Sequence, residues 1–268
     1  MIWPPDDRIR RAFAETAKRY DDLARRRFRR IATEMIAAAE VNRKDRILDV
    51  ACGSGLVARV LSERALPKPV GLDISMDLLR LAPPGPLVCA DAMRIPARSQ
   101  RFDVVLCSLG IQMFEDPDVA LQEMHRVLVD RGRIGLTSWS DGGVVDLDRA
   151  AVDALDEFLQ GRPDYDPSRW RVPQIFIGTE QEMIEALQDN GFTAPEIRAR
   201  RKRSAFRDSH HYLDMLSIFP AVWARLNSLA ESELSEARDL TAAAIEREVG
   251  HSGAFEILDE VLISTARR

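Results

Sequence analysis

Asp49, Asp73 and two glycines have types and spacings that could bind a nucleoside ligand. Asp49 precedes a glycine-rich turn that contains Gly53 and Gly55, and Asp73 follows Gly53 by 20 residues. A glycine turn between a strand and a helix lets the backbone approach a ligand closely and aims free N–H groups at it. A carboxylate at the end of the next strand can accept hydrogen bonds from both hydroxyls of a ribose.

Two ligands fit this spacing, a dinucleotide and S-adenosylmethionine. Gly53, Gly55 and Ala58 satisfy the relaxed dinucleotide fingerprint. The carboxylate of Asp49, however, would repel a pyrophosphate in the turn by about 1 kcal/mol or more. S-adenosylmethionine instead carries an ammonium and a sulfonium, which a carboxylate attracts. Asp49 therefore favours the sulfonium ligand.

Asp91 and Ala92 extend the same logic to the base. They follow a third apolar run, and a carboxylate followed by a backbone N–H matches the amine donor and ring acceptor on one edge of adenine. Ile74 and Met76, just past Asp73, are apolar and could sandwich the ring. Acids that end successive parallel strands meet at the carboxyl edge of the sheet, where open α/β sheets bind ligands.

Alternating patterns predict the elements that hold these residues. Short apolar runs indicate strands at 46–52, 70–73, 87–91, 102–106 and 134–139, with further strands at 196–206 and 257–265. Helical periodicity indicates one amphipathic helix through Leu23, Phe28 and Met35, and further helices after most strands. Asp116 before Pro117 is a typical helix start, and Thr179 with Glu182 forms a capping box. This alternation implies an α/β fold with a parallel sheet and helices on both faces.

These residues resemble those of class I S-adenosylmethionine-dependent methyltransferases. The segments 47–55, 71–75 and 90–92 are similar to the family's first, ribose and adenine motifs, and the segments 102–105 and 123–132 to its later elements. Ubiquinone/menaquinone-biosynthesis and related small-molecule methyltransferases are the most similar subgroup. The resemblance covers about 20–140, 175–206 and 254–267. It implies a Rossmann-like, seven-stranded, mostly parallel sheet with an antiparallel last strand, helices on both faces and a helical cap.

The resemblance also implies the domain organisation and the site. The chain would be a single domain, 1–268, whose cofactor-binding core is interrupted at about 141–175 and 207–252 by insertions that form the substrate cap. S-adenosylmethionine would be the cofactor. Its expected binding residues are Tyr20, Asp49, Ala51, Gly53, Gly55, Asp73, Ile74, Met76, Asp91, Ala92 and Ser108, and Gln112 and Trp139 are expected at the substrate.

The expected reaction is transfer of the methyl group to an oxygen, nitrogen or carbon nucleophile, giving S-adenosylhomocysteine. The insertions are rich in large apolar residues, which favours a small, largely apolar acceptor; these residues are Phe158, Tyr165, Trp170, Phe176, Tyr212, Leu216, Phe219 and Trp223. No residue is assigned as the catalytic base. His210 and His211 begin the second insertion and are the candidates.

Composition narrows the other possibilities. The formal net charge of −5 gives no reason to expect nucleic acid as a partner. The apolar stretches are short and charged, so we expect no membrane span. The three cysteines, Cys52, Cys89 and Cys107, cannot pair completely and lie in or beside apolar runs, so we expect small core residues, no metal site and a reducing cytoplasm. A monomer or homodimer is expected.

Three other functions remain open at this point. A methyltransferase-like protein could use S-adenosylmethionine as a structural or electrostatic element in a cyclisation or rearrangement. A nicotinamide-dependent oxidoreductase is disfavoured by Asp49. A non-catalytic partner protein would bind the cofactor, if at all, without turnover.

Overall fold

The computed structural model describes residues 7–140, 145–162, 165–166 and 177–268. The described residues group into two compact units. The sheet unit comprises those of 17–140, 177–200 and 260–268, and the helical unit those of 7–16, 145–166 and 201–259. The interpretation of 141–175 and 207–252 as insertions into one domain stays a prediction.

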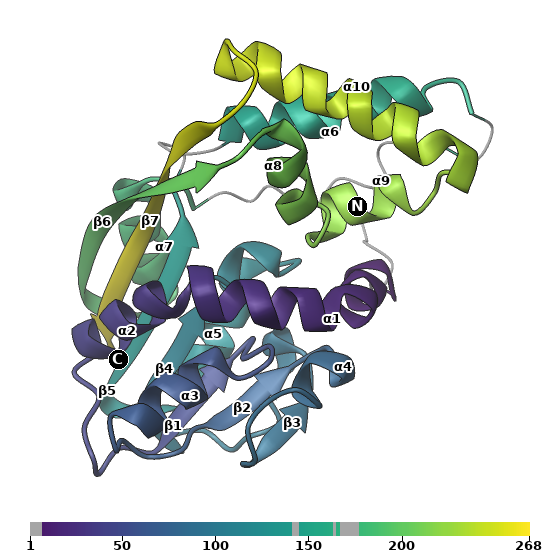
Figure 1. Cartoon of the computed structure of the whole chain (residues 1–268). Coiled ribbons are helices and arrows are strands. Elements are labelled where there is room, and N and C mark those ends of the chain that lie inside the picture. Colours follow the sequence, from purple (N-terminus) through teal and green to yellow (C-terminus); the bar gives the residue numbers. More distant parts are fainter. Residues whose placement is uncertain (1–6, 141–144, 163–164, 167–176) are drawn as a thin grey trace. The chain divides into compact units, whose positions relative to one another are not determined.

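The elements follow one another along the chain as labelled in Figure 1. They are α1 Asp7–Arg27, α2 Arg29–Ala38, β1 Ile47–Val50, α3 Leu56–Glu63, β2 Val70–Asp73, α4 Met76–Leu79, β3 Leu87–Cys89, the short 3-10 helix η1 Ala92–Arg94, β4 Phe102–Ser108, the 3-10 helix η2 Ile111–Met113, α5 Pro117–Val127, β5 Leu128–Trp139, α6 Val145–Leu159, α7 Glu180–Asp189, β6 Thr193–Phe206, α8 Ser209–Leu216, α9 Pro220–Leu226, α10 Glu231–Val249 and β7 Phe255–Arg267.

The strands form one seven-stranded sheet in the order β3-β2-β1-β4-β5-β7-β6. Strands β1 to β5 pair in parallel, with Leu48 opposite Val70 and Val105, whereas β7 runs antiparallel to β5 with Leu136 opposite Ser264. The expected fold class, a Rossmann-like and mostly parallel sheet with an antiparallel last strand, is confirmed. The order reverses at β1, so the carboxyl ends of β1 and β4 form the switch point where such sheets bind ligands.

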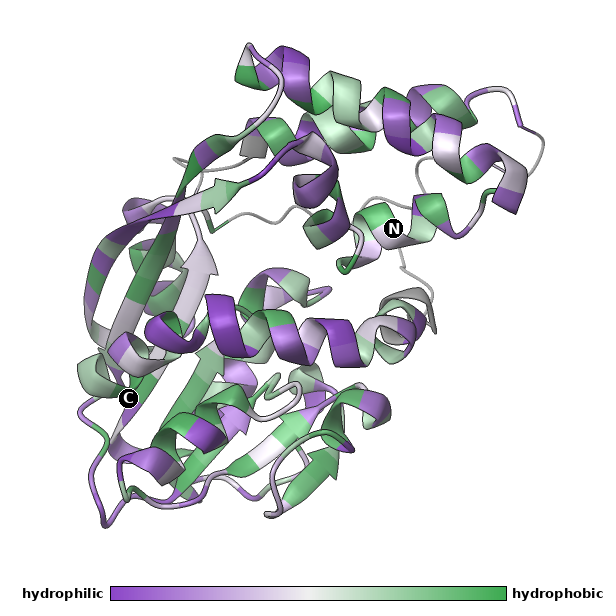
Figure 2. Cartoon of the chain, viewed as in Figure 1, coloured by the Kyte–Doolittle hydropathy of each residue, from purple (hydrophilic) through white to green (hydrophobic). Residues whose placement is uncertain are grey.

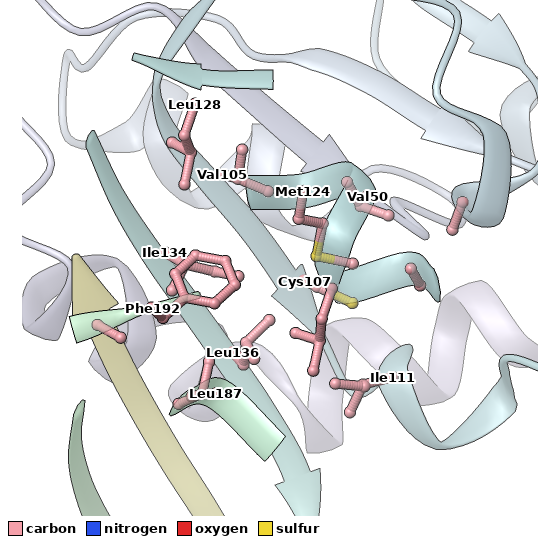
Figure 3. Packing of buried hydrophobic residues seen from close by; sticks show 14 of the residues in the cluster. Val50, Val105, Cys107, Ile111, Met124, Leu128, Ile134, Leu136, Leu187 and Phe192 are labelled. Carbon is pink, nitrogen blue, oxygen red and sulfur yellow. The ribbon is translucent and has the colours of Figure 1, made fainter. Parts of the chain in front are cut away.

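Helices cover both faces of the sheet because successive strand residues point to opposite faces. Leu48 and Val50 join the buried cluster that contains α5 and α7. Ile47 joins a second cluster with α2 and α3. Figure 3 shows the first cluster, in which Met124 and Leu187 from the two helices pack near Leu136 and Cys107 of the strands. The period-two alternation places Asp49 on the same face as Ile47, toward α2 and α3.

Side chains of α6, α8, α9 and α10 pack into a separate core in the helical unit. Phe206, Tyr212 and Phe255 are in mutual ring contact there, with centroids 4.8–5.9 Å apart. Leu216 also belongs to this cluster. Tyr212 and Leu216 are thus core residues of the helical unit. Trp170 and Phe176, also expected in the substrate cap, lie outside the described residues.

The helix boundaries confirm the capping signals but correct the first helix. Asp116 accepts a hydrogen bond from the Val119 N–H ahead of α5, and the Thr179–Glu182 capping box is present. The single helix expected through Leu23 and Met35 is instead two, because the chain breaks at Phe28 between α1 and α2. Figure 2 shows purple hydrophilic bands along α1 and mostly green strands at β1 and β4.

Two further expectations need correction. Strand β5 begins at Leu128, six residues before the expected start at 134, so Gly132 lies inside the strand. Cys52 and Cys107 are buried as expected, but Cys89 is exposed, because β3 is an edge strand of the sheet. Within the described residues, no helix combines the length and the hydropathy that crossing a membrane would require.

Candidate functional site

The glycine-rich turn after β1 adopts backbone angles that explain its composition. Gly53 and Gly55 have φ angles of 53° and 80°, and Ala51 has a φ of 54°. Gly55 also has no room for a side chain, since a Cβ there would lie 2.5 Å from Cδ of Pro83. Gly55 begins α3 as its N-terminal cap residue. The turn thus brings backbone, without bulky side chains, to the switch point of the sheet.

Asp49 is buried without a partner among the residues that the structure describes. It is only 1% exposed, and among the described residues both of its carboxylate oxygens lack a hydrogen-bond partner. Burial raises the pKa of the Asp49 carboxyl well above its usual range, and the nearby charge of Asp73 raises it further. A buried carboxylate without a partner costs several kcal/mol. The side chain is therefore suited to a ligand that supplies donors or positive charge.

A pocket lies against Asp49. It is lined by Tyr20, Ala24, Phe28, Asp49, Ala51, Cys52, Gly53, Ser54, Leu56, Val57, Ser108 and Leu109. Among these described lining residues there is no lysine or arginine. The lining is mainly small and apolar, and Asp49 is its only carboxylate. A pyrophosphate would find no cation in this lining, whereas an ammonium would find a carboxylate.

Asp73, at the end of β2, anchors the glycine-rich turn to β2 through its side chain. Its Oδ2 accepts a hydrogen bond of 2.7 Å from the Gly53 N–H, and its Oδ1 accepts one of 2.8 Å from the Ser75 N–H. Burial raises the pKa of Asp73, and these backbone donors oppose the rise. Each carboxylate oxygen has two lone pairs, so both retain capacity for a ligand hydroxyl. Asp73 was expected at the ribose, and its bond to Gly53 is an additional, structural role.

The residues expected at the adenine follow two neighbouring strands: Ile74 and Met76 come after β2, and Asp91 and Ala92 come after β3. Asp91 caps η1, its Oδ1 accepting a 2.8 Å hydrogen bond from the Met93 N–H, and Ala92 is buried. Ile74 and Met76 are 39% and 45% exposed. Both side chains are therefore available for contact with a ligand. None of these residues lines the pocket at Asp49, and their contact with adenine stays a prediction.

Helix α1 and Phe28, the residue that follows it, supply one wall of the pocket through positions four apart. Tyr20, Ala24 and Phe28 all line it, as expected for one face of a helix. The Tyr20 ring lies 3.7 Å from the position a Cβ would take at Gly53. Burial and the charge of Asp73 raise the pKa of the Tyr20 phenol. Tyr20 was singled out from the sequence, while Ala24 and Phe28 were missed although their spacing carried the signal.

The turn after β4 supplies the opposite wall. Ser108 and Leu109 line the pocket. Gln112 and Trp139, expected at the substrate, are joined to each other, since Gln112 Oε1 accepts a 3.1 Å hydrogen bond from the Trp139 N–H. The Trp139 ring also packs edge-on against Phe28, with centroids 5.8 Å apart. Both residues therefore support the pocket walls without lining the pocket themselves.

His210 and His211 belong to the helical unit and are not among the residues that line the pocket. His210 is 3.5 Å from Asp239 at an exposed position. The Nδ1 of His211 accepts a hydrogen bond from the Arg207 N–H. A role of either histidine as base stays a prediction.

The chemistry of the residues that line the pocket fits S-adenosylmethionine. The two unpartnered oxygens of Asp49 match a cationic amino-acid group, and Gly53 lines the same pocket without a side chain. No group of three or more histidine, cysteine or acidic side chains that could hold a metal ion occurs among the described residues. The sequence missed Ser54 and Leu109, since neither carries a chemical signal that separates it from a packing residue.

Comparison with known proteins agrees with this chemistry. A family model described as a methyltransferase domain matches residues 48–136. A malonyl-[acyl-carrier protein] O-methyltransferase of Pseudescherichia vulneris is 30% identical over 71% of this chain and 80% of its own length. A ubiquinone/menaquinone biosynthesis C-methyltransferase of Citrifermentans bemidjiense is 33% identical over 50% of this chain and 64% of its own length. For two other curated relatives, the match spans only 55% and 49% of their length.

A solved structure supports the fold. The phosphoethanolamine N-methyltransferase 2 of Haemonchus contortus, in complex with phosphomonomethylethanolamine and S-adenosylhomocysteine, matches with a TM-score of 0.53 and 16% identity. The match covers 88% of this chain and 52% of that one. The sequence relatives, the domain match and the fold agree: the chain belongs to the S-adenosylmethionine-dependent methyltransferase family.

Proposed function

We propose that the protein transfers the methyl group of S-adenosylmethionine to an oxygen, nitrogen or carbon nucleophile of a small, largely apolar metabolite and releases S-adenosylhomocysteine. One observation carries the proposal. Asp49 presents a buried carboxylate, without a partner among the described residues, to a pocket beside a glycine-rich turn. A cationic ligand would pair with this carboxylate, whereas an anionic ligand would be repelled by it.

Asp49 would hold the ammonium end of the cofactor. A charged hydrogen bond contributes about 1.5–3 kcal/mol, and the low-dielectric surroundings strengthen it. Binding would also return the carboxyl to its ionised form, since burial is the main cause of its raised pKa. The Gly53 and Ala51 backbone, Gly55, Tyr20 and Ser108 would complete this end of the site.

Asp73 would accept hydrogen bonds from the ribose hydroxyls. Because it also fixes the Gly53 N–H, it would couple the position of the ribose to that of the turn. Asp91 and the Ala92 N–H would bind the edge of adenine, and Ile74 and Met76 would cover its faces. These assignments rest on the exposure of the apolar pair and on the position of each acid at a strand end.

The chain's own contribution to the reaction would be positioning and exclusion of water. When bound, the cofactor supplies a methyl group on a sulfonium, which is already a good leaving group. Phe28, Leu56 and Leu109 line the pocket with apolar surface, which keeps water from the reacting atoms. Holding the partners in line accounts for most of such catalysis. A proton-accepting residue is needed only for an acceptor that must lose a proton early, with His210 and His211 as the candidates.

The names of the relatives bear on the acceptor. They describe an O-methyltransferase acting on a malonyl group on a carrier protein and a C-methyltransferase of quinone biosynthesis. This breadth supports an acceptor chosen outside the cofactor core, in the segments 141–175 and 207–252 that we propose as the substrate cap. A cytoplasmic location, action as a monomer or homodimer, and independence of nucleic acid belong to the same proposal.

Isothermal titration of the protein with S-adenosylmethionine, S-adenosylhomocysteine and NAD tests the proposal. We expect binding of the first two and none of NAD. Asp49→Asn should weaken S-adenosylmethionine binding by roughly 10- to 100-fold. Asp103→Asn is the matched control, since Asp103 lies in the same unit but is paired with Arg46. It should bind like the wild type.

Three results would contradict the proposal. Tight NAD binding without S-adenosylmethionine binding would indicate an oxidoreductase. Unchanged affinity of a folded Asp49→Asn variant would remove Asp49 from the site. Turnover of an acceptor without formation of S-adenosylhomocysteine would indicate a cyclisation or rearrangement in which the cofactor is not consumed.

A further inference from the structure

The turn that follows β4 has a strained backbone at the pocket. Leu109 lines the pocket and has a φ of 57°, in the left-handed region that a branched side chain rarely adopts. Strain of this kind persists only where the surroundings hold it. Contacts with neighbouring residues must therefore hold the backbone of Leu109 in this conformation.

Thr137 of β5 provides the main restraint. The Leu109 N–H donates to the Thr137 hydroxyl at 2.9 Å and to the Thr137 carbonyl at 3.1 Å. Thr137 Oγ1 also lies 3.5 Å from the hydroxyl of Ser108, the other pocket residue of this turn. Thr137 itself is fully buried, at 0% exposure. One hydroxyl thus contacts both wall residues without touching the pocket.

The turn is also confined from the side of the glycine-rich loop. A Cβ at Gly110 would lie 2.5 Å from Cβ of Ala51 and 2.9 Å from Sγ of Cys107. Gln112, further along, accepts the Trp139 N–H and so joins the same loop to the end of β5. Displacement of Leu109 therefore shifts the wall that faces Asp49.

We propose that Thr137 is a positioning residue, whose hydroxyl fixes Ser108 and Leu109 in the wall of the cofactor pocket. The inference rests on the proposed function and adds to it a residue that contacts no ligand. A threonine in a parallel strand is ordinarily read as β-sheet propensity, so sequence alone gives it no special status. Its hydrogen bond to Leu109 distinguishes it.

Thr137→Val tests the proposal, because valine has the shape of threonine without the hydroxyl. The carbonyl of residue 137 still accepts the Leu109 N–H, so the variant keeps part of the restraint and should fold. We expect S-adenosylhomocysteine binding to weaken by about three- to tenfold. Thr137→Ser, which restores the hydroxyl, should recover most of the affinity.

Thr241→Val is the matched control. Thr241 is also 0% exposed and its hydroxyl donates to the Ala237 carbonyl at 2.7 Å, but it lies on α10 of the helical unit. It should leave the affinity unchanged while shifting the urea midpoint by a similar amount. Equal weakening by both variants, or wild-type affinity of Thr137→Val, would overturn the inference.

Hydrogen exchange at the Leu109 amide provides a readout that needs no cofactor. Thr137→Val should speed exchange at this amide about tenfold, and Thr241→Val should not. If the wild type failed to bind S-adenosylmethionine, the proposed function would fail while the exchange rates still decided the role of Thr137. Unchanged exchange at Leu109 would reject that role.

Discussion

Asp49 of the sheet unit differs from the buried polar groups at the core of the helical unit. In the helical unit, Arg225 is 2% exposed and pairs with Asp156 at 2.5 Å, and Asp156 also accepts from the Tyr165 hydroxyl. Tyr212 donates to Asp148 at 2.5 Å. In the sheet unit, Asp49 is as deeply buried and has no partner among the described residues.

This difference distinguishes buried polar groups that stabilise the fold from one that is suited to bind a ligand. A buried ion pair or hydroxyl pair that is satisfied within the chain fixes a core and needs nothing else. A buried carboxylate without a partner destabilises the unliganded protein and stabilises a cationic complex. Among the described residues, the buried side-chain atoms without partners, on Asp49, Arg59 and Ser264, all belong to the sheet unit.

Arg225→Ala should have the largest effect on stability. It removes the partner of Asp156 and the hydrogen bond to the Ala221 carbonyl, leaving a partly buried charge. The free energy of unfolding should fall by about 3–5 kcal/mol in urea titration. Arg203→Ala, at an exposed pair with Glu256, should cost less than about 1 kcal/mol. Equal losses would show that the buried pair does not hold the helical unit.

Gly55→Ala and Gly250→Ala compare one glycine from each unit. Both have positive φ, 80° and 87°, but only Gly55 has a neighbour, Pro83, where a Cβ would stand. Gly250→Ala should cost about 1 kcal/mol of unfolding free energy from backbone strain, and Gly55→Ala about 3 kcal/mol because overpacking is added. Gly55→Ala should also weaken cofactor binding. Equal destabilisation by the two substitutions would show that the loop at Gly55 shifts to accommodate a Cβ.

The pH dependence of stability distinguishes a carboxyl without a partner from one in an ion pair. Burial raises the pKa of Asp49 in the folded protein, so its contribution is favourable below the unfolded value near 3.8 and is lost as pH rises toward the folded pKa. Asp103 behaves oppositely, because Arg46 lowers its pKa, and its contribution is lost as pH falls below that value. Asp49→Asn should reduce the decline in the free energy of unfolding with rising pH. A single titrating group can contribute at most about 1.4 kcal/mol per pH unit to that decline.

Calorimetry provides the corresponding ligand measurement. Binding of S-adenosylmethionine below the folded pKa of Asp49 should release a proton, seen as a dependence of the heat on buffer ionisation. Asp49→Asn should abolish that proton release. Its persistence in the variant would assign the proton to another group, with Asp73, whose pKa is also raised, as the first to examine.

His210→Ala and His211→Ala should have the smallest effect. Neither histidine lines the pocket at Asp49, so the affinity for S-adenosylmethionine should change by less than about 0.5 kcal/mol. Titration calorimetry measures this. A loss of turnover at unchanged affinity would support a role as base, whereas a large loss of affinity would contradict the assignment of the cofactor to the sheet unit alone.

The fold and the acids of the site could be predicted because both depend on local pattern. The turn at Gly53, with Asp49 before it and Asp73 beyond it, follows from residue type and strand alternation. The break at Phe28 could not be predicted, since helical periodicity continues through it. Cys89 was misplaced because an apolar run does not reveal whether its strand is central or at an edge. The unpartnered state of Asp49 and the contact of Thr137 with Leu109 depend on long-range packing, which sequence spacing does not encode.

The two edge strands of the sheet, β3 and β6, have different features that disfavour pairing with a strand of another molecule. Strand β3 is only three residues long and offers few backbone groups, although Leu87 is 38% exposed. Strand β6 has 14 residues, and its exposed side chains include Arg198, Arg200 and Arg203. Each of these arginines is paired with a glutamate, so the edge carries solvated charges of both signs, which pairing with another strand would desolvate. Brevity at one edge and exposed charge at the other therefore disfavour continuous sheets between copies.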